Sequence, residues 1–125
     1  MGRLLPLLAL CAAAACEPAW SVQGQVRVEG VDARPLRGAT VSLRCPGGQQ
    51  DVSAVTDHEG VFELGGRGPG PALECTVVVA APAFVQARFP LAQACEDSRD
   101  DPPGRCEVAM VDAVLSRAEA RSLAR

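Results

Sequence analysis

The chain has 125 residues, of which 48% are hydrophobic, and a formal net charge of -3. This length suits one small domain with a core, and the acidic balance argues against nucleic acid as a partner. One Trp and three Phe are too few for an aromatic stacking surface.

Residues 1–15 have the features of a signal peptide. Arg3 precedes an apolar stretch, residues 4–12, that is too short to span a bilayer. Small residues at 13–15 lead directly to Cys16, and this arrangement resembles a bacterial lipobox, although Ala13 stands where Leu is usual. The resemblance implies that Cys16 receives a diacylglyceryl group, becomes the mature N-terminus and holds the protein to a membrane. The basic residues are all Arg, which indicates GC-rich bacterial codon usage.

Cysteine parity agrees with lipidation. Cys11 would leave with the signal peptide, so five of the six cysteines would remain in the mature chain. An odd cysteine in an exported protein needs a role, and lipidation of Cys16 leaves four for two disulfides. The alternative is ordinary cleavage after Ala15 and a freely secreted or periplasmic protein. Glu17 follows Cys16, where an Asp would act as a signal for retention in the inner membrane, so the outer membrane is favoured. Residues 16–21 are then a short tether, and Trp20 is expected to cap the end of the domain, the alternative being that it rests at the membrane interface.

The remaining residues alternate between apolar runs and turn signals. Strands are predicted at residues 22–29, 39–45, 52–56, 61–64, 73–80, 84–91 and 107–115. Loops are expected between them, including the glycine-rich residues 65–71 and the acidic residues 92–106. Seven short strands without helix-length spacers indicate an all-β sandwich over residues 22–116. Ser116 and Glu119 have capping-box spacing, so the tail at 117–125 is expected to form a short helix or to fray.

Four cysteines permit three disulfide pairings, of which one is favoured. Cys45 ends the second predicted strand on its inward face, and Cys75 lies near the start of the fifth. Antiparallel neighbours would bring these two residues together, so we pair Cys45 with Cys75 and Cys95 with Cys106. The main alternative is zinc binding, but the paired C-x₂-C spacing of a zinc site is missing, and we expect no metal.

The order of the motifs resembles the carboxypeptidase regulatory-like domain. The family pattern V-x-G-x-V, P-L-x-G-A-x-V-x-L, T-D-x-x-G-x-F-x-L and A-x-G-F appears here from Val22, Pro35, Thr56 and Ala81. The resemblance covers about residues 22–91 and implies a transthyretin-like, seven-stranded antiparallel Greek-key sandwich. Ala33-Arg34 replaces a glycine-bearing turn and Ala83 replaces Gly before Phe84, which suggests changed turns at both places.

No residue group makes a convincing catalytic site. Asp57, His58 and Glu59 suggest acid–base or metal chemistry, but a turn explains them more simply, with Asp57 accepting backbone N–H bonds and Gly60 at positive φ. The serines lack a nucleophile-elbow context. Hydroxyisourate hydrolases share the implied fold, but their several histidines and C-terminal Tyr-Arg-Gly-Ser motif have no match in this chain.

We therefore expect a non-catalytic lipoprotein module of the bacterial cell envelope, without a cofactor. Its lipid would contact the membrane, and the loops at 65–71 and 92–106 would face an envelope protein partner. One alternative is a carbohydrate-binding module, against which the low aromatic content argues. The other is a freely secreted structural protein.

Overall fold

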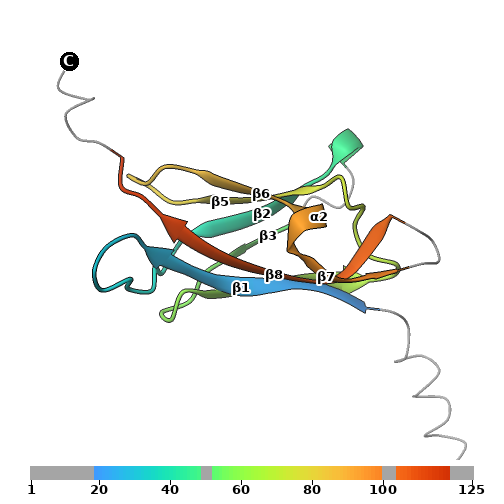
Figure 1. Ribbon diagram of the computed structural model, residues 1–125, viewed down its shortest axis with the longest axis horizontal. Helices are drawn as coiled ribbons and strands as arrows, with labels where there is room; N and C mark the ends of the chain where they lie inside the picture. The colour runs from blue at the N-terminus through green and yellow to red at the C-terminus, as the bar shows by residue number, and fades with distance from the viewer. Residues whose placement is uncertain (1–18, 49–51, 100–103, 119–125) are drawn as a thin grey trace, which may run out of the picture.

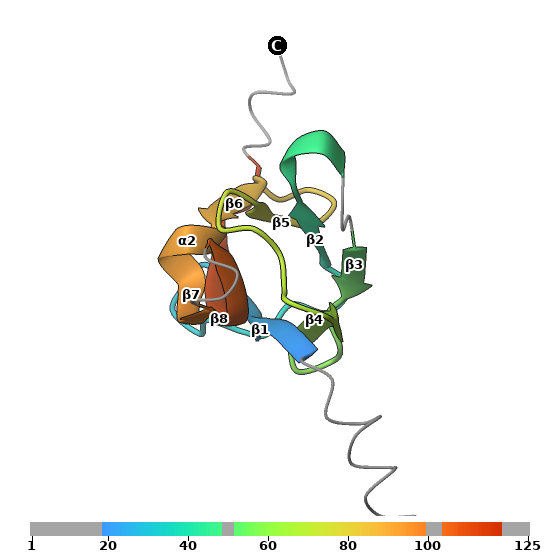
Figure 2. The same cartoon turned by 90° about the vertical axis from the view of Figure 1, so that its right-hand side faces the viewer.

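The computed structural model describes residues 19–48, 52–99 and 104–118, which form two packed β-sheets (Figures 1 and 2). The predicted signal peptide, Cys16 and the tail at 119–125 lie outside these residues. One sheet has the order β4-β1-β8-β7. Its strands are β1 (Ala19–Val28), β4 (Val61–Arg67), β7 (Cys95–Arg99) and β8 (Arg105–Leu115). The other has the order β3-β2-β5-β6. Its strands are β2 (Thr40–Arg44), β3 (Val52–Val55), β5 (Thr76–Ala80) and β6 (Ala87–Pro90).

The all-β sandwich predicted from the sequence is confirmed, but two details of the prediction are wrong. The described residues form eight strands, because the acidic stretch predicted as a loop contains β7. The pairing is also not purely antiparallel, because β1 runs parallel to β8 from Ser21 opposite Val108 to Val28 opposite Leu115. Two short helical turns complete the described elements, η1 (Pro46–Gly48) and α2 (Leu91–Ala94).

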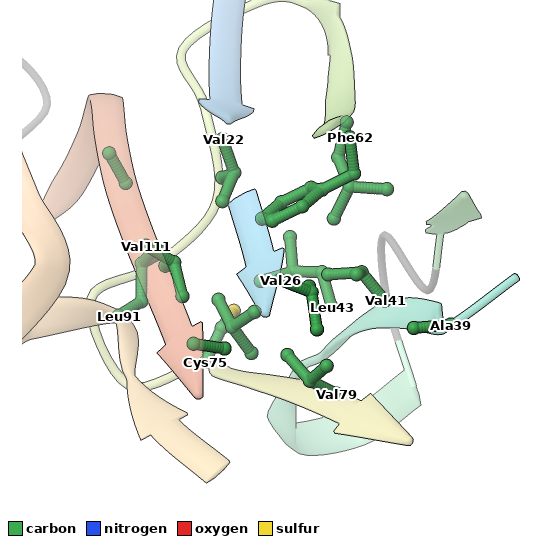
Figure 3. Close-up of a cluster of buried hydrophobic side chains, with 14 of the residues drawn as sticks. Val22, Val26, Ala39, Val41, Leu43, Phe62, Cys75, Val79, Leu91 and Val111 are labelled. Carbon is green, nitrogen blue, oxygen red and sulfur yellow. The ribbon is translucent and has the colours of Figure 1, made fainter. Parts of the chain in front are cut away.

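Alternating side chains from the two sheets fill the space between them (Figure 3). Val41 and Leu43 of β2 are fully buried, while Thr40 and Arg44 on the same strand are exposed. This alternation is what a half-buried strand requires. In β5 the residues Val77–Val79 are all buried, in agreement with the prediction of a central strand.

Trp20 explains why β4 continues through its glycines. The sequence predicted a loop from Gly65, yet the strand extends to Arg67 and pairs with β1 back to Ala19. The Trp20 side chain is only 5% exposed, and a Cβ on Gly66 would lie 2.9 Å from its indole Nε1. Glycine at this position therefore leaves room for the indole to pack over the strand. Trp20 belongs to β1 and to the core, so the sheet begins within the stretch predicted as a tether.

The two alanines that depart from the family pattern keep the backbone conformation of glycine. Ala33 has φ 46° and Ala83 has φ 70°, and they are the two non-glycine residues with positive φ in the described part of the chain. The Ala83 turn is closed by a hydrogen bond from Phe84 N to Ala81 O of 3.1 Å. Both alanines thus have a backbone conformation that favours glycine, and Ala83 has it within a hydrogen-bonded turn.

Candidate functional site

The acidic turn between β3 and β4 is held by its own carboxylate. Asp57 Oδ1 accepts hydrogen bonds from Glu59 N and Val61 N, both at 2.9 Å. The bond from Val61, together with the bond from Glu59 and the charge of His58, lowers the pKa of Asp57 below its ordinary value of 3.8. Hydrogen bonds to the charged form favour that form. The turn predicted from the sequence is confirmed.

Thr56 connects this turn to the loop that precedes β2. Its side chain is 2% exposed, and its Oγ1 donates to Leu36 O at 2.6 Å and accepts from Ala39 N at 2.9 Å. Its backbone N also donates to Ala39 O at 2.9 Å. A buried hydroxyl that both donates and accepts leaves neither of its backbone partners unsatisfied. No role for Thr56 was predicted from the sequence, although this threonine belongs to the T-D-x-x-G pattern.

Gly60 connects the turn to β1, in the sheet that contains β4. Its φ is 75°, and a Cβ there would lie 2.4 Å from Val26 O. Val26 N donates to Gly60 O at 2.8 Å, and Gln25 Nε2 donates to Glu59 O at 2.8 Å. Asp57 therefore holds the turn itself, and Glu59 and Gly60 connect the turn to β1. His58 and Glu59 are exposed, and among residues 19–48, 52–99 and 104–118 no group of three or more His, Cys, Asp or Glu could hold a metal.

Both disulfides join the pairs that the sequence analysis favoured. Cys45 and Cys75 have Cα atoms 4.2 Å apart, and Cys95 and Cys106 have Cα atoms 5.9 Å apart. The first bond extends the pairing of β2 and β5 beyond Arg44 opposite Thr76. The second attaches β7 to β8 across a register that contains β-bulges.

The strands run so that the sandwich has two distinct ends. We call the end at which β1 begins, at Ala19, the proximal end, and the other the distal end (Figure 1). Arg67 pairs with Ala19. Backbone hydrogen bonds from Leu73 N to Gly104 O and from Cys106 N to Pro71 O, both 2.9 Å, hold the following loop beside the start of β8. Of the two segments predicted to meet a partner, residues 68–71 therefore lie at the proximal end, and the end of β7 and the start of β8 lie there too.

The distal end has a different surface. It contains the loop between β1 and β2, the acidic turn, and the loop between β5 and β6 (Figure 1). Three exposed valines lie there: Val31 at 104% exposure, Val55 at 63% and Val85 at 55%. Arg117 sits over the Phe84 ring, 5.2 Å from its centroid. Within the described residues no helix is long and apolar enough to cross a membrane.

Comparison with solved structures shows the fold and no more. The chain is similar to hydroxyquinol 1,2-dioxygenase from Pseudomonas putida DLL-E4, with 12% identity over 81% of this chain and a TM-score of 0.52. It is similar to 3-chlorocatechol 1,2-dioxygenase from Rhodococcus opacus 1CP, with 9% identity over 82% of this chain and a TM-score of 0.53. It is also similar to the Bacillus anthracis TIE protein, with 13% identity over 80% of this chain and a TM-score of 0.52.

The chain spans 57% and 61% of the two dioxygenase chains and 18% of the TIE chain. No protein-family model matches the sequence. No curated protein matches it either. At these identities the likeness concerns the β-sandwich alone, because one fold carries many unrelated functions.

Proposed function

We propose that this protein is a non-catalytic lipoprotein module of the bacterial envelope, held to a membrane by a lipid on Cys16. Cysteine parity carries the proposal. The chain has six cysteines, and the four in the described domain form two disulfides with each other. The cysteines left over are Cys11, inside the predicted signal peptide, and Cys16, directly after the small residues of the lipobox-like motif. Disulfides of this kind persist in oxidising compartments, which agrees with export.

The position of β1 in the chain would determine which end of the sandwich faces the membrane. Only residues 17 and 18 separate Cys16 from the start of β1 at Ala19, and three Cα–Cα steps span at most about 11 Å. The proximal end would therefore face the bilayer. With β1 along the membrane normal, the nine steps between its ten residues, at about 3.3 Å each, would place the distal end about 30 Å farther out. A protein partner would reach the distal half of the sandwich more easily than the proximal loops.

The finer fold that we propose is the transthyretin-like Greek-key sandwich of the carboxypeptidase regulatory-like domain. The hydrogen bonds of Thr56 and Asp57 and the positive φ of Gly60 supply a physical reason for the T-D-x-x-G pattern. The positive φ of Ala33 and Ala83 places this chain's departures at positions where glycine is favoured. The carbohydrate-binding alternative gains no support, because Trp20 and Phe62 are buried. Phe84 and Phe89 are half-buried.

Fractionation of cells that express single cysteine variants tests the anchor. Cys16→Ser should move the protein from the membrane fraction to the soluble exported fraction. Cys11→Ser is the matched control, since it changes a cysteine in the apolar stretch without touching the lipidation site, and should leave the protein in the membrane. If Cys16→Ser stays in the membrane as fully as the wild type, the lipid anchor is wrong.

A further inference from the structure

The last strand of the sandwich has a free edge along half of its length. β8 pairs with β1 through Leu115, but β7 pairs with it only from Arg105 to Ala109. Because Cys95 is the first residue of β7 and lies opposite Ala109, the strand pairing ends there, and the preceding chain forms α2, which packs beside β8. In the described part of the molecule, no strand pairs with residues 110–114 on the side away from β1.

The hydrogen-bonding groups on this edge can be assigned from the neighbouring bonds. Leu115 O accepts from Glu29 N at 2.9 Å, so Leu115 directs its backbone groups towards β1. Ser116 O accepts from Val85 N at 2.8 Å, on the opposite side. Successive residues of a strand alternate between the two sides. The N–H and C=O groups of Met110, Asp112 and Val114 therefore point to the free edge. Such a row of backbone groups is a template for another strand.

A hollow of about 200 Å³ lies beside this edge, between β8 and the edge strand β6 of the other sheet. Phe89 and Pro90 of β6, Gln93 and Ala94 of α2, and residues 110–112 of β8 line it. Phe89 lies opposite Val77, on the inward-facing side of β6, yet it is only half-buried. Met110 is 43% exposed. Figure 2 shows α2 beside β7 and β8 at this side of the sandwich. The hollow would receive apolar side chains from a strand placed along β8.

The charge on the edge sets the chemistry of the added strand. Asp112 is exposed and lies opposite Gln25 of β1. No hydrogen bond or ion pair joins its carboxylate to another residue in the described ranges. Opposite charges on directly facing residues of neighbouring strands stabilise a sheet, and like charges destabilise it. A basic residue facing Asp112 would complement it.

We propose that residues 110–114 of β8 bind an extended segment of a partner protein as an added antiparallel strand that continues the line of β7. The segment presents a basic residue to Asp112 on the outer face and apolar residues, on either side of it, towards Phe89 and the hollow. Backbone hydrogen bonds supply affinity in this mode, and alternate side chains supply specificity. The inference rests on the proposed function only for the class of partner, an envelope protein.

The probe is an acetylated and amidated fluorescent peptide of sequence Thr-Val-Lys-Val-Thr, which matches residues 110–114 in length, titrated into the chain from residue 16 carrying Cys16→Ser. We expect saturable binding and shifts of the backbone amide signals of Met110, Asp112 and Val114. N-methylation of the lysine removes the N–H that faces β8 and should weaken binding at least tenfold. N-methylation of one flanking valine is the matched control, because that N–H points away from β8, and should change binding much less.

Reversal of the charge at residue 112 tests the role of the Asp112 carboxylate. Asp112→Lys should weaken the lysine peptide and favour a peptide with glutamate at the centre, whereas Asp32→Lys, in the exposed loop between β1 and β2, should leave the preference unchanged. The proposal is overturned by absence of binding, by equal losses from both N-methylations, or by a preference that Asp112→Lys leaves unchanged. If Asp112→Lys does not fold, the two N-methylated peptides still decide the result.

The same titration distinguishes other occupants and separates this proposal from the anchor. Amide shifts at the β8 edge that grow with protein concentration without peptide would mean that a second copy occupies it, and would refute a foreign segment. The titrated protein carries no lipid, so failure of the peptide to bind leaves the membrane anchor standing. Failure of the anchor in the fractionation experiment likewise leaves the peptide result standing.

Discussion

Replacing Thr56 by valine should destabilise the fold far more than the loss of one oxygen suggests. Valine has nearly the same shape, but it would leave Ala39 N–H and Leu36 C=O without the partners they have at 2.9 and 2.6 Å. Both groups contact a side chain that is 2% exposed. Each buried unsatisfied group costs about 1–3 kcal/mol, so we expect a loss of roughly 2–6 kcal/mol from the two groups. Small domains have a free energy of unfolding of only about 5–15 kcal/mol.

The assay is urea denaturation of the mature chain from residue 16 carrying Cys16→Ser. Thr56→Ser keeps the hydroxyl and removes one methyl group, so it should cost about 1 kcal/mol. Thr40→Val makes the same chemical change at an exposed position of β2 and should alter the free energy of unfolding by less than about 0.5 kcal/mol. A cost for Thr56→Val no larger than that for Thr56→Ser would show that the two hydrogen bonds do not stabilise the junction.

Three further predictions concern Gly60, the two disulfides and Asp57. Gly60→Ala should destabilise the protein clearly more than Gly104→Ala. Both glycines have positive φ, 75° and 79°, but only at Gly60 would the new Cβ lie 2.4 Å from a backbone carbonyl oxygen of β1. Similar losses of stability for the two variants in thermal denaturation would contradict this. Replacing both cysteines of the Cys45–Cys75 disulfide by alanine should lower the free energy of unfolding by about 3.6 kcal/mol, and the same change in Cys95–Cys106 by about 2.8 kcal/mol. The difference comes from the entropy of loop closure over separations of 30 and 11 residues. The reverse order in urea denaturation would refute this loop-closure explanation. Because folding lowers the pKa of Asp57, its charge stabilises the protein fully above the ordinary pKa of 3.8 and that contribution disappears as the pH falls through the lower folded value. The stability advantage of the wild type over Asp57→Asn should therefore shrink between pH 7 and about pH 3, and an advantage independent of pH would be inconsistent with the charge.

Local patterns predicted the strands that have clear alternation. The alternating Val41 and Leu43 identify β2 as a strand with one buried face. The continuous apolar run at Val77–Val79 identifies β5 as a strand with both faces buried. The acidic turn was also predictable, since Asp57 and Gly60 each have a local reason for their positions. The two disulfides followed from the expected neighbours of β2 and β5.

Long-range contacts explain what the sequence did not predict. Gly66 belongs to a strand because Trp20, far away in the chain, packs against it. β7 contains Glu96 and Asp97 and has no apolar alternation, so its pairing depends on its position at the sheet edge and on the disulfide at Cys95. The parallel pairing of β1 with β8 joins the two ends of the domain. The free edge of β8 follows from these features, so it could not be read from local sequence.

The proposed anchor at Cys16 would determine where this domain is held and which end faces outward. Mass spectrometry of the N-terminal peptide of the protein purified from membranes tests it most directly. We expect a mature chain that begins at Cys16, with a diacylglyceryl group in thioether linkage to its Sγ. A mature protein whose Cys16 carries a free thiol, or whose first residue lies elsewhere, would contradict the anchor and the orientation derived from it.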